Sequence, residues 1–179
     1  MGKGKLIRGV LSCALAVMLL AVESAALTID LVTVGHPGNE PTAAGSGAVG
    51  YSYQIGTHEV LNSQYAEFLN SVAATDTYGL FNLGMEVNVF GGIVQSGSSG
   101  SYTYSVKANM GDKPVTFVSF YDAARFSNWL ENGQPIGAQG AGTTETGSYT
   151  LFTDGSTTTN MSSRGAGAGW VLPTDDEWY

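Results

Sequence analysis

Two stretches of the chain place apolar residues at helical spacing. In the first, Tyr65, Phe68, Leu69 and Val72 stand at i, i+3, i+4 and i+7, shortly after Asn62. Asparagine is a favoured N-cap residue because its side chain accepts a hydrogen bond from the first turn. The spacing therefore predicts a helix with Asn62 as its N-cap, the clearest in the chain.

A second helix is predicted after Ser119, because Asp122 three residues later completes a capping box. Asn132-Gly133 marks its end. Its apolar face consists of Ala123, Phe126, Trp129 and Leu130.

The same capping box recurs at Thr174 and Glu177, which predicts the start of a third helix. Only five residues follow Thr174. An isolated helix needs about 12–15 residues to be even marginally stable in water. We therefore expect the domain to be incomplete at its C-terminus, either as a fragment or because the usual continuation has been lost.

Alternation of apolar and polar residues predicts short strands. They are 27–34, 51–55 with a continuation to 60, 102–106, and one strand of a hairpin within 148–153. Apart from 102–106, residues 75–111 are expected to be loop, and the Gly, Thr, Ser and Ala content of 137–169 makes a helix implausible there. Short strands and separate helices predict an α+β domain.

Residues 1–26 have the pattern of a secretory signal peptide. Lys3, Lys5 and Arg8 precede an apolar run at 10–22, and small residues at 24–26 suit cleavage before Leu27. A membrane span would need about 20 apolar residues. We therefore expect a secreted, periplasmic or cell-surface protein without a membrane span after cleavage. The chain then divides into the signal peptide (1–26), an N-terminal strand and loop (27–50) and the main domain (51–179).

Charge and cysteine content narrow the chemistry. The 179 residues include 25 glycines, are 12% charged and carry a net charge of −8. Cleavage after residue 26 leaves 153 residues with four basic and fourteen acidic side chains, for a net charge of −10. Such a chain is not expected to bind nucleic acid, which requires clustered basic residues. The single cysteine, Cys13, leaves with the signal, so neither disulfides nor thiol chemistry are expected in the mature chain. A lipoprotein cysteine is the weaker interpretation of Cys13, since the apolar run continues past it.

No residue is assigned a catalytic, cofactor-binding or metal-binding role. His36 and His58 each lack a second histidine three to five residues away. The acidic run 175–177 is better explained by a helix start than by calcium binding. Asn160 begins a glycosylation sequon, which matters only in a eukaryotic secretory host. The following aromatic residues are expected mainly in the core, with sugar stacking as the second interpretation: Tyr51, Tyr53, Tyr65, Phe68, Phe120, Phe126, Trp129, Trp170 and Trp178.

Three segments in order carry a family resemblance. Residues 56–68 resemble G-x-x-E-V-T-N-x-x-Y-x-x-F, residues 114–130 resemble P-V-x-x-V-S-W-x-D-A-x-x-[FY]-x-x-W, and residues 172–179 resemble R-L-P-T-E-A-E-W-E-Y without its first residue. Together they resemble the formylglycine-generating enzyme family, also called the sulfatase-modifying factor domain.

The chain departs from these motifs in three places. Leu61 stands for the usual Thr, Phe120 for Trp and Val171 for Arg. The first two are tolerable packing changes, whereas the third removes a charge and a structural salt bridge that an arginine there would allow.

The resemblance implies a C-type-lectin-like α+β fold, rich in loops and glycine. It also implies that complete enzymes of the family use two cysteines that bind copper to oxidise a sulfatase cysteine to formylglycine, and that they bind calcium. Those cysteines, the calcium ligands and the substrate groove lie beyond the third motif, so neither copper nor calcium is expected in this chain.

Two functions are therefore considered. The first is a secreted, non-catalytic module that binds a protein, such as a sulfatase-like partner, or a glycan. The alternative is the N-terminal part of a formylglycine-generating oxidase, for which two cysteines encoded beyond Tyr179 would be diagnostic. Oligomeric state is left open.

Overall fold

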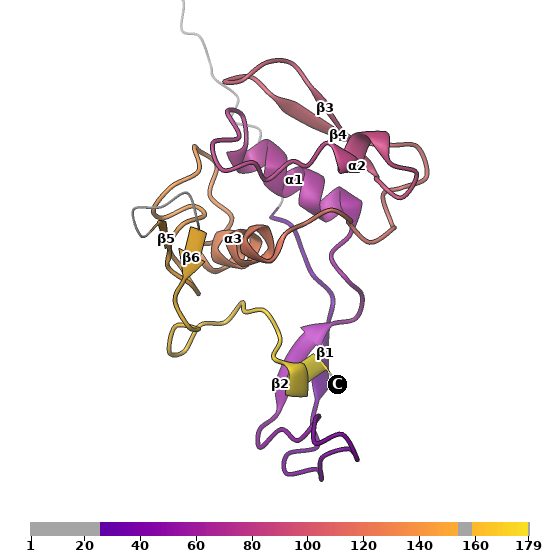
Figure 1. Ribbon diagram of the computed structural model, residues 1–179, viewed down its shortest axis with the longest axis vertical. Helices are drawn as coiled ribbons and strands as arrows, with labels where there is room; N and C mark the ends of the chain where they lie inside the picture. Colours follow the sequence, from indigo (N-terminus) through magenta and orange to yellow (C-terminus); the bar gives the residue numbers. More distant parts are fainter. Residues whose placement is uncertain (1–25, 154–158, 179) are drawn as a thin grey trace, which may run out of the picture.

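The computed structural model describes residues 26–153 and 159–178. The strands pair as three separate antiparallel hairpins, and they accompany two long helices, α1 and α3 (Figure 1). This mixture is an α+β architecture, as predicted. The elements are β1 (Leu31–Val34), β2 (Tyr53–Gly56), α1 (Asn62–Val72), α2 (Gly84–Val87), β3 (Ile93–Ser96), β4 (Thr103–Val106), α3 (Phe120–Glu131), β5 (Leu151–Thr153), β6 (Thr159–Met161) and α4 (Asp175–Trp178).

The signal segment predicted at 1–26 lies outside the described residues except for Ala26. None of the helices formed by residues 26–153 and 159–178 is both long and apolar enough to cross a membrane.

The main core forms where the apolar faces of α1 and α3 meet. The ring of Phe68 lies 5.3 Å from that of Phe126 and 5.2 Å from that of Trp129, centroid to centroid. All three side chains are buried, together with Tyr65 and Leu69 of α1. Aromatic pairs at this separation contribute about 0.5–1.5 kcal/mol beyond their burial. The helical spacing of the sequence thus identified the core correctly.

The predicted capping box of α3 is confirmed. Ser119 Oγ accepts a hydrogen bond from the Asp122 N–H at 3.2 Å, and the Ser119 N–H donates to Asp122 Oδ2 at 3.3 Å. The helix ends at Glu131, followed by Asn132 as C-cap and Gly133 at a φ of 79°. Glycine adopts this left-handed conformation without steric cost.

The predicted N-cap of α1 is wrong by one residue. The cap is Leu61, whose N–H donates to Gln64 Oε1 at 2.9 Å. Asn62 is instead the first helical residue, and its buried Nδ2 donates to the carbonyl oxygens of Met110 at 2.9 Å and Lys113 at 3.0 Å. Its amide therefore joins α1 to the segment after β4 rather than capping its own helix.

Two elements lie in a region expected to be loop. The strand β3 pairs with the predicted strand β4 in a register that sets Ile93 opposite Val106, and Ile93 is fully buried. The single-turn helix α2 buries Met85. Both elements are only four residues long, and β3 does not alternate apolar with polar residues, so neither carries a repeating pattern. Their stability comes from pairing and packing with distant segments, which a local pattern does not reveal.

The remaining hairpins follow the predictions with shorter strands. The first predicted strand begins at Leu31 rather than Leu27, and it pairs with β2 so that Val34 lies opposite Tyr53. The strand expected within 148–153 is β5, which pairs with β6. The turn between them lies outside the described residues.

Candidate binding groove

A groove of about 1260 Å³ opens between the β1–β2 hairpin and the chain segment that ends in α4. Residues 51–60 line one side, and residues 164–173 with α4 line the other. Side chains of α3, including Phe126 and Leu130, contribute the surface between them. In Figure 1, α4 (yellow) lies beside the hairpin, at the lower end of the molecule. The groove therefore brings together segments from both ends of the described chain.

Glu177 anchors α4 across this groove. Its carboxylate accepts hydrogen bonds from Arg164 Nη1 at 3.0 Å, Arg164 Nη2 at 2.5 Å and the Tyr51 hydroxyl at 2.6 Å. The Tyr53 hydroxyl donates to the backbone oxygen of Glu177, also at 2.6 Å. The capping box predicted for this helix is confirmed, since Glu177 Oε2 accepts from the Thr174 N–H at 2.8 Å and the Glu177 N–H donates to Thr174 Oγ1 at 3.2 Å.

The charges in this cluster shift the titration of its members. The hydrogen bond from Arg164 lowers the pKa of Glu177 to about 2, although burial acts in the opposite direction. The same contact raises the pKa of the Arg164 guanidinium. The hydrogen bond to Glu177 raises the pKa of the Tyr51 phenol. Glu177 is therefore ionised over the whole physiological range, and its pairing holds α4 against the β1–β2 hairpin.

Although Val171 carries no charge, α4 still forms an ion pair. Arg164, seven residues earlier, supplies the guanidinium that binds Glu177. No local pattern predicts this pairing, because Arg164 stands alone in a glycine-rich stretch with no helical register to Glu177.

The strand β2, which has one strand partner among the described residues, lines the groove. The strand β2 pairs with β1 on one side, and within the described chain no third strand joins this sheet. Residues 53–56, the whole of β2, are among those that line the groove. Backbone N–H and C=O groups on an unpaired edge form a template for another extended chain.

Two exposed aromatic rings accompany this edge. Tyr51 and Trp178 both line the groove, and their exposed fractions are 53% and 67%. Tyr51 also lies edge-on to Tyr53, with ring centroids 6.2 Å apart. Both tyrosine hydroxyls are held by Glu177, which fixes the direction of the rings. Core packing was therefore the correct prediction for Tyr65, Phe68, Phe126 and Trp129, and it was wrong for Tyr51, Phe120 and Trp178.

The structure places the remaining candidate residues of the sequence analysis at different sites. His58 lines the groove, whereas His36 lies in an exposed loop outside it. The acidic side chains of α4 diverge: Asp176 accepts a hydrogen bond from the Gly47 N–H at 2.9 Å, while Glu177 binds Arg164. Their contacts are those of a helix start and its anchor.

Copper finds no thiolate ligand among the residues that the structure describes. Copper(I) prefers soft thiolate ligands, and the chain's one cysteine, Cys13, precedes the described part. Over 26–153 and 159–178, there is no group of three or more His, Cys, Asp or Glu side chains placed to hold a metal ion.

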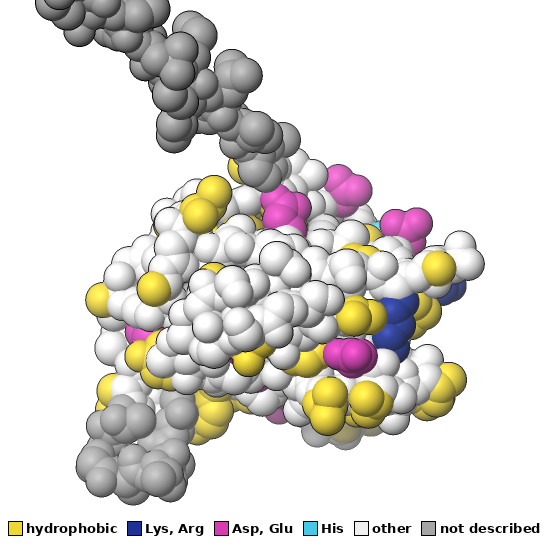
Figure 2. All heavy atoms as spheres, turned by 90° about the horizontal axis from the view of Figure 1, so that it is seen from above, with side chains coloured by type: hydrophobic (Ala, Val, Ile, Leu, Met, Phe, Trp, Pro, Cys, Tyr) yellow, Lys and Arg dark blue, Asp and Glu magenta, His cyan; other side chains and the backbone are white. Residues whose placement is uncertain are grey.

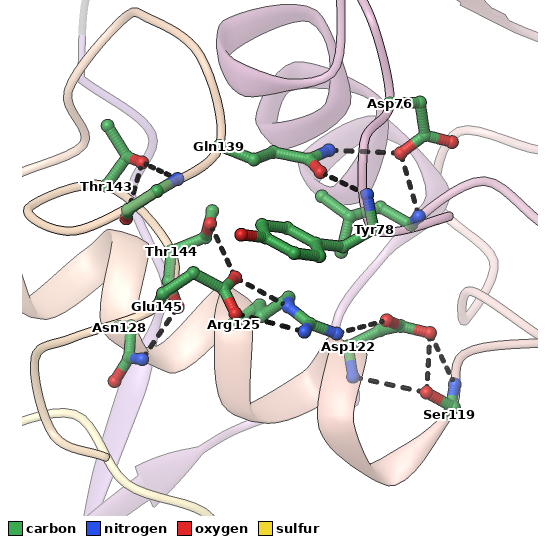
Figure 3. A network of polar contacts seen from close by, with 12 residues as sticks. Asp76, Tyr78, Ser119, Asp122, Arg125, Asn128, Gln139, Thr143, Thr144 and Glu145 are labelled. Carbon is green, nitrogen blue, oxygen red and sulfur yellow. Dashed lines mark hydrogen bonds and ion pairs between the residues drawn. The ribbon is translucent and has the colours of Figure 1, made fainter. Parts of the chain in front are cut away.

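A second polar cluster surrounds Arg125 of α3 (Figure 3). Its guanidinium donates to both carboxylate oxygens of Glu145, at 2.7 and 3.1 Å, and to Asp122 Oδ1 at 3.4 Å. The ring of Tyr78 lies 4.7 Å from the guanidinium carbon. Figure 3 shows these side chains converging from α3 and from two loops that lie far apart in sequence.

Burial decides the electrostatics of this second cluster. It raises the pKa of Asp122, although hydrogen bonds from Ser119 and Arg125 act against it. Burial alone would lower the pKa of Arg125, but the hydrogen bond and charge of Glu145, together with Asp122, raise it above its ordinary value. Every charged group in the cluster is paired internally. We therefore assign it to holding the loops around Tyr78 and Glu145 on α3, rather than to binding a ligand.

The fold and the groove together define a class: an α+β domain with two capped core helices, short hairpins and a third capped helix that closes against the first hairpin. Residues 31–179 match the family described as sulfatase-modifying factor enzyme 1-like domain. The chain belongs to this family, as its three motifs indicated. No match was found among curated proteins or among solved structures.

Proposed function

We propose that this chain is a secreted, non-catalytic domain of C-type-lectin-like fold, and that its groove binds an extended segment of polypeptide. The observation that carries the proposal is the unpaired edge of β2 along the groove. A polypeptide added to this edge would gain main-chain hydrogen bonds, and pockets for its alternate side chains would supply specificity. A sulfatase-like protein is one partner of this chemistry.

The surfaces around the edge suit such a ligand. The groove has an apolar lining that includes Ile29, Ile55 and Val118. It is also lined by two exposed aromatic rings, those of Tyr51 and Trp178. Glu177 and Arg164 neutralise one another, so the lining near α4 presents no unpaired charge from this pair. An extended peptide with apolar residues at alternate positions would therefore meet no uncompensated charge from this pair, and the other carboxylate of the lining, Glu59, is exposed to solvent.

A glycan is the second candidate ligand. Exposed aromatic rings stack on sugar faces, and Tyr51 and Trp178 are rings of this kind. A glycan has no main chain of amide groups to pair with a strand edge, however, and this favours the polypeptide.

The alternative function is that of the N-terminal part of a formylglycine-generating oxidase. That reaction requires two thiolates, and residues 27–179 contain no cysteine. The thiolates would have to come from another segment. In this case the residues described here would act as the scaffold that holds it.

The proposal is tested by selecting random twelve-residue peptides on phage against the full chain. Selected peptides are then titrated into ¹⁵N-labelled protein. We expect shift changes at 51–60 and 164–178, and a loss of affinity of about tenfold or more in Tyr51→Ala and Trp178→Ala. Phe120→Ala is the matched control, because this ring is 61% exposed but does not line the groove.

Three results would contradict the proposal. The first is the absence of any enriched peptide, and the second is a set of shift changes that lie outside the groove. The third is binding on a glycan array that Tyr51→Ala abolishes, since it would assign the groove to a sugar. For the alternative function, a protein that joins this chain to a segment carrying two cysteines is incubated with Cu(I), oxygen and a cysteine-containing sulfatase peptide, and aldehyde formation would establish the oxidase.

A further inference from the structure

A second surface, separate from the groove, exposes a cluster of large apolar side chains around α2. Its five members are between 40% and 82% exposed, and we call them the α2 patch: Leu83, Val87, Val89, Phe90 and Phe117. They come from two segments that touch. A Cβ on Gly84 would lie 2.7 Å from Phe117 Cδ1, and Thr116 Oγ1 donates to the Phe90 carbonyl oxygen at 2.9 Å. The two segments that carry the patch are therefore in contact.

The protein holds this surface in place at a conformational cost. Phe117 has a φ of 63°, a left-handed conformation that is strained for a side chain of this size. Strain of this kind persists only where the surroundings enforce it, and it is concentrated at functional positions. In this case it accompanies an aromatic ring that remains 40% exposed.

Lys107 supplies hydrogen bonds to backbone carbonyl groups next to the α2 patch. Its ammonium group donates to the carbonyl oxygens of Glu86, Asn88 at 3.4 Å and Gly91 at 2.8 Å. These carbonyls belong to the turn that carries Val87, Val89 and Phe90. Since they already have a donor, covering the turn with a partner would not leave them without a hydrogen bond, which would otherwise be costly.

The local charge disfavours a strongly charged partner. The two segments that carry the patch, 82–91 and 107–117, contain Glu86, Asp112, Lys107 and Lys113, for a net charge of zero, whereas the whole chain carries −8. The side of the molecule that carries α2 lies on the right in both Figure 1 and Figure 2. On that side, Figure 2 shows apolar side chains next to both basic and acidic ones. An anionic lipid surface or an acidic protein would find no excess of positive charge.

We infer that the α2 patch is the contact between two copies of this chain, related by a two-fold axis. Such a contact is self-complementary, and a neutral apolar surface meets itself without like-charge repulsion. The exposed parts of the five side chains amount to on the order of 500 Å² of apolar area. That is close to the apolar share, about 65%, of the roughly 800 Å² that each partner contributes to a standard interface.

Sedimentation velocity of the full chain, from about 1 to 100 µM, tests this inference. A monomer–dimer equilibrium is expected, and raising the salt concentration should not weaken it, because no ion pair is involved. Val89→Asp and Phe90→Ser should each weaken the dimer at least about tenfold. Ile136→Asp is the control, because this side chain is 79% exposed but lies in the loop after α3, outside the patch. It should leave the dimer intact.

Near-ultraviolet circular dichroism of each variant distinguishes lost contact from lost fold. Native spectra with loss of the dimer only in the α2 patch variants would support the inference. A wild-type chain that stays monomeric to 100 µM would overturn it, as would a dimer that persists in both natively folded patch variants or a patch-dependent association with anionic vesicles by a monomer. These outcomes are independent of peptide binding in the groove, since none of the α2 patch residues lines it.

Discussion

Arg164 binds Glu177 through two parallel contacts, Nη1 to Oε1 at 3.0 Å and Nη2 to Oε2 at 2.5 Å. This fork geometry adds both strength and direction to an ion pair. Since Tyr51 binds the same carboxylate from a position 126 residues away in the chain, one side chain connects the first hairpin, the glycine-rich segment and α4. The width of the groove therefore depends on Glu177.

Glu177→Gln should loosen α4 without unfolding the core. The substitution keeps the shape of the side chain but removes the charge that Arg164 and Tyr51 bind. Loss of a charged hydrogen bond of this kind costs about 1–3 kcal/mol. If α4 opens by that much more easily, hydrogen exchange of the Trp178 amide should accelerate about 5- to 150-fold. Asp175→Asn removes a charge from the same helix at an exposed position and should change exchange far less.

Acid should release α4 before it unfolds the domain. The folded-state pKa of Glu177 is about 2, against an ordinary value of 4.5. A carboxylate with a lowered pKa stabilises the fold fully above its unfolded value, and this contribution is lost as the pH falls toward the folded value. Exchange of the Trp178 amide, corrected for its intrinsic pH dependence, should therefore increase between pH 4.5 and 2. The step should be absent in Glu177→Gln, and its persistence there would contradict the assignment.

The sequence predicted elements whose signals are local. Capping boxes identified the starts of α3 and α4, and helical spacing identified the faces that Phe68 and Trp129 bury. Both signals operate within one or two turns of chain, so a single sequence displays them. The family resemblance extended these local predictions to a correct membership.

The groove could not be predicted, because its parts are joined by long-range contacts. Nothing in the sequence pairs Tyr51 with Glu177. The exposed position of Tyr51 also escaped prediction, since alternation shows that a strand has two faces but not which neighbours cover them. Asn62 was misassigned for the same reason: its partners, Met110 and Lys113, lie about fifty residues away.

Arg125→Met should be among the most destabilising single substitutions in the domain. Its side chain is only 5% exposed, and its removal would leave the carboxylates of Glu145 and Asp122 partly buried without a cation. Breaking one partner of a buried pair costs about 3–5 kcal/mol. Urea unfolding measures this loss.

The double variant Arg125→Met with Glu145→Gln separates pairing from packing. If the loss reflects an unpaired carboxylate, the double variant should be more stable than Arg125→Met alone. Arg125→Lys should be intermediate, because lysine keeps the charge but lacks the fork that matches Glu145. Equal stability of the single and double variants would contradict the ion-pair explanation.

Gly92→Ala should destabilise the junction between α1 and the β3–β4 hairpin. A Cβ at residue 92 would lie 2.4 Å from the side-chain atoms of Asn62, which is itself fixed by two backbone carbonyls. Because Asn62 is buried and cannot move aside, overpacking should cost about 1–3 kcal/mol in urea unfolding. Gly111→Ala is the control, since a Cβ there meets no atom within 4 Å. It should change stability by about 0.5 kcal/mol or less. Equal effects of the two substitutions would show that backbone flexibility, not the contact with Asn62, determines the loss.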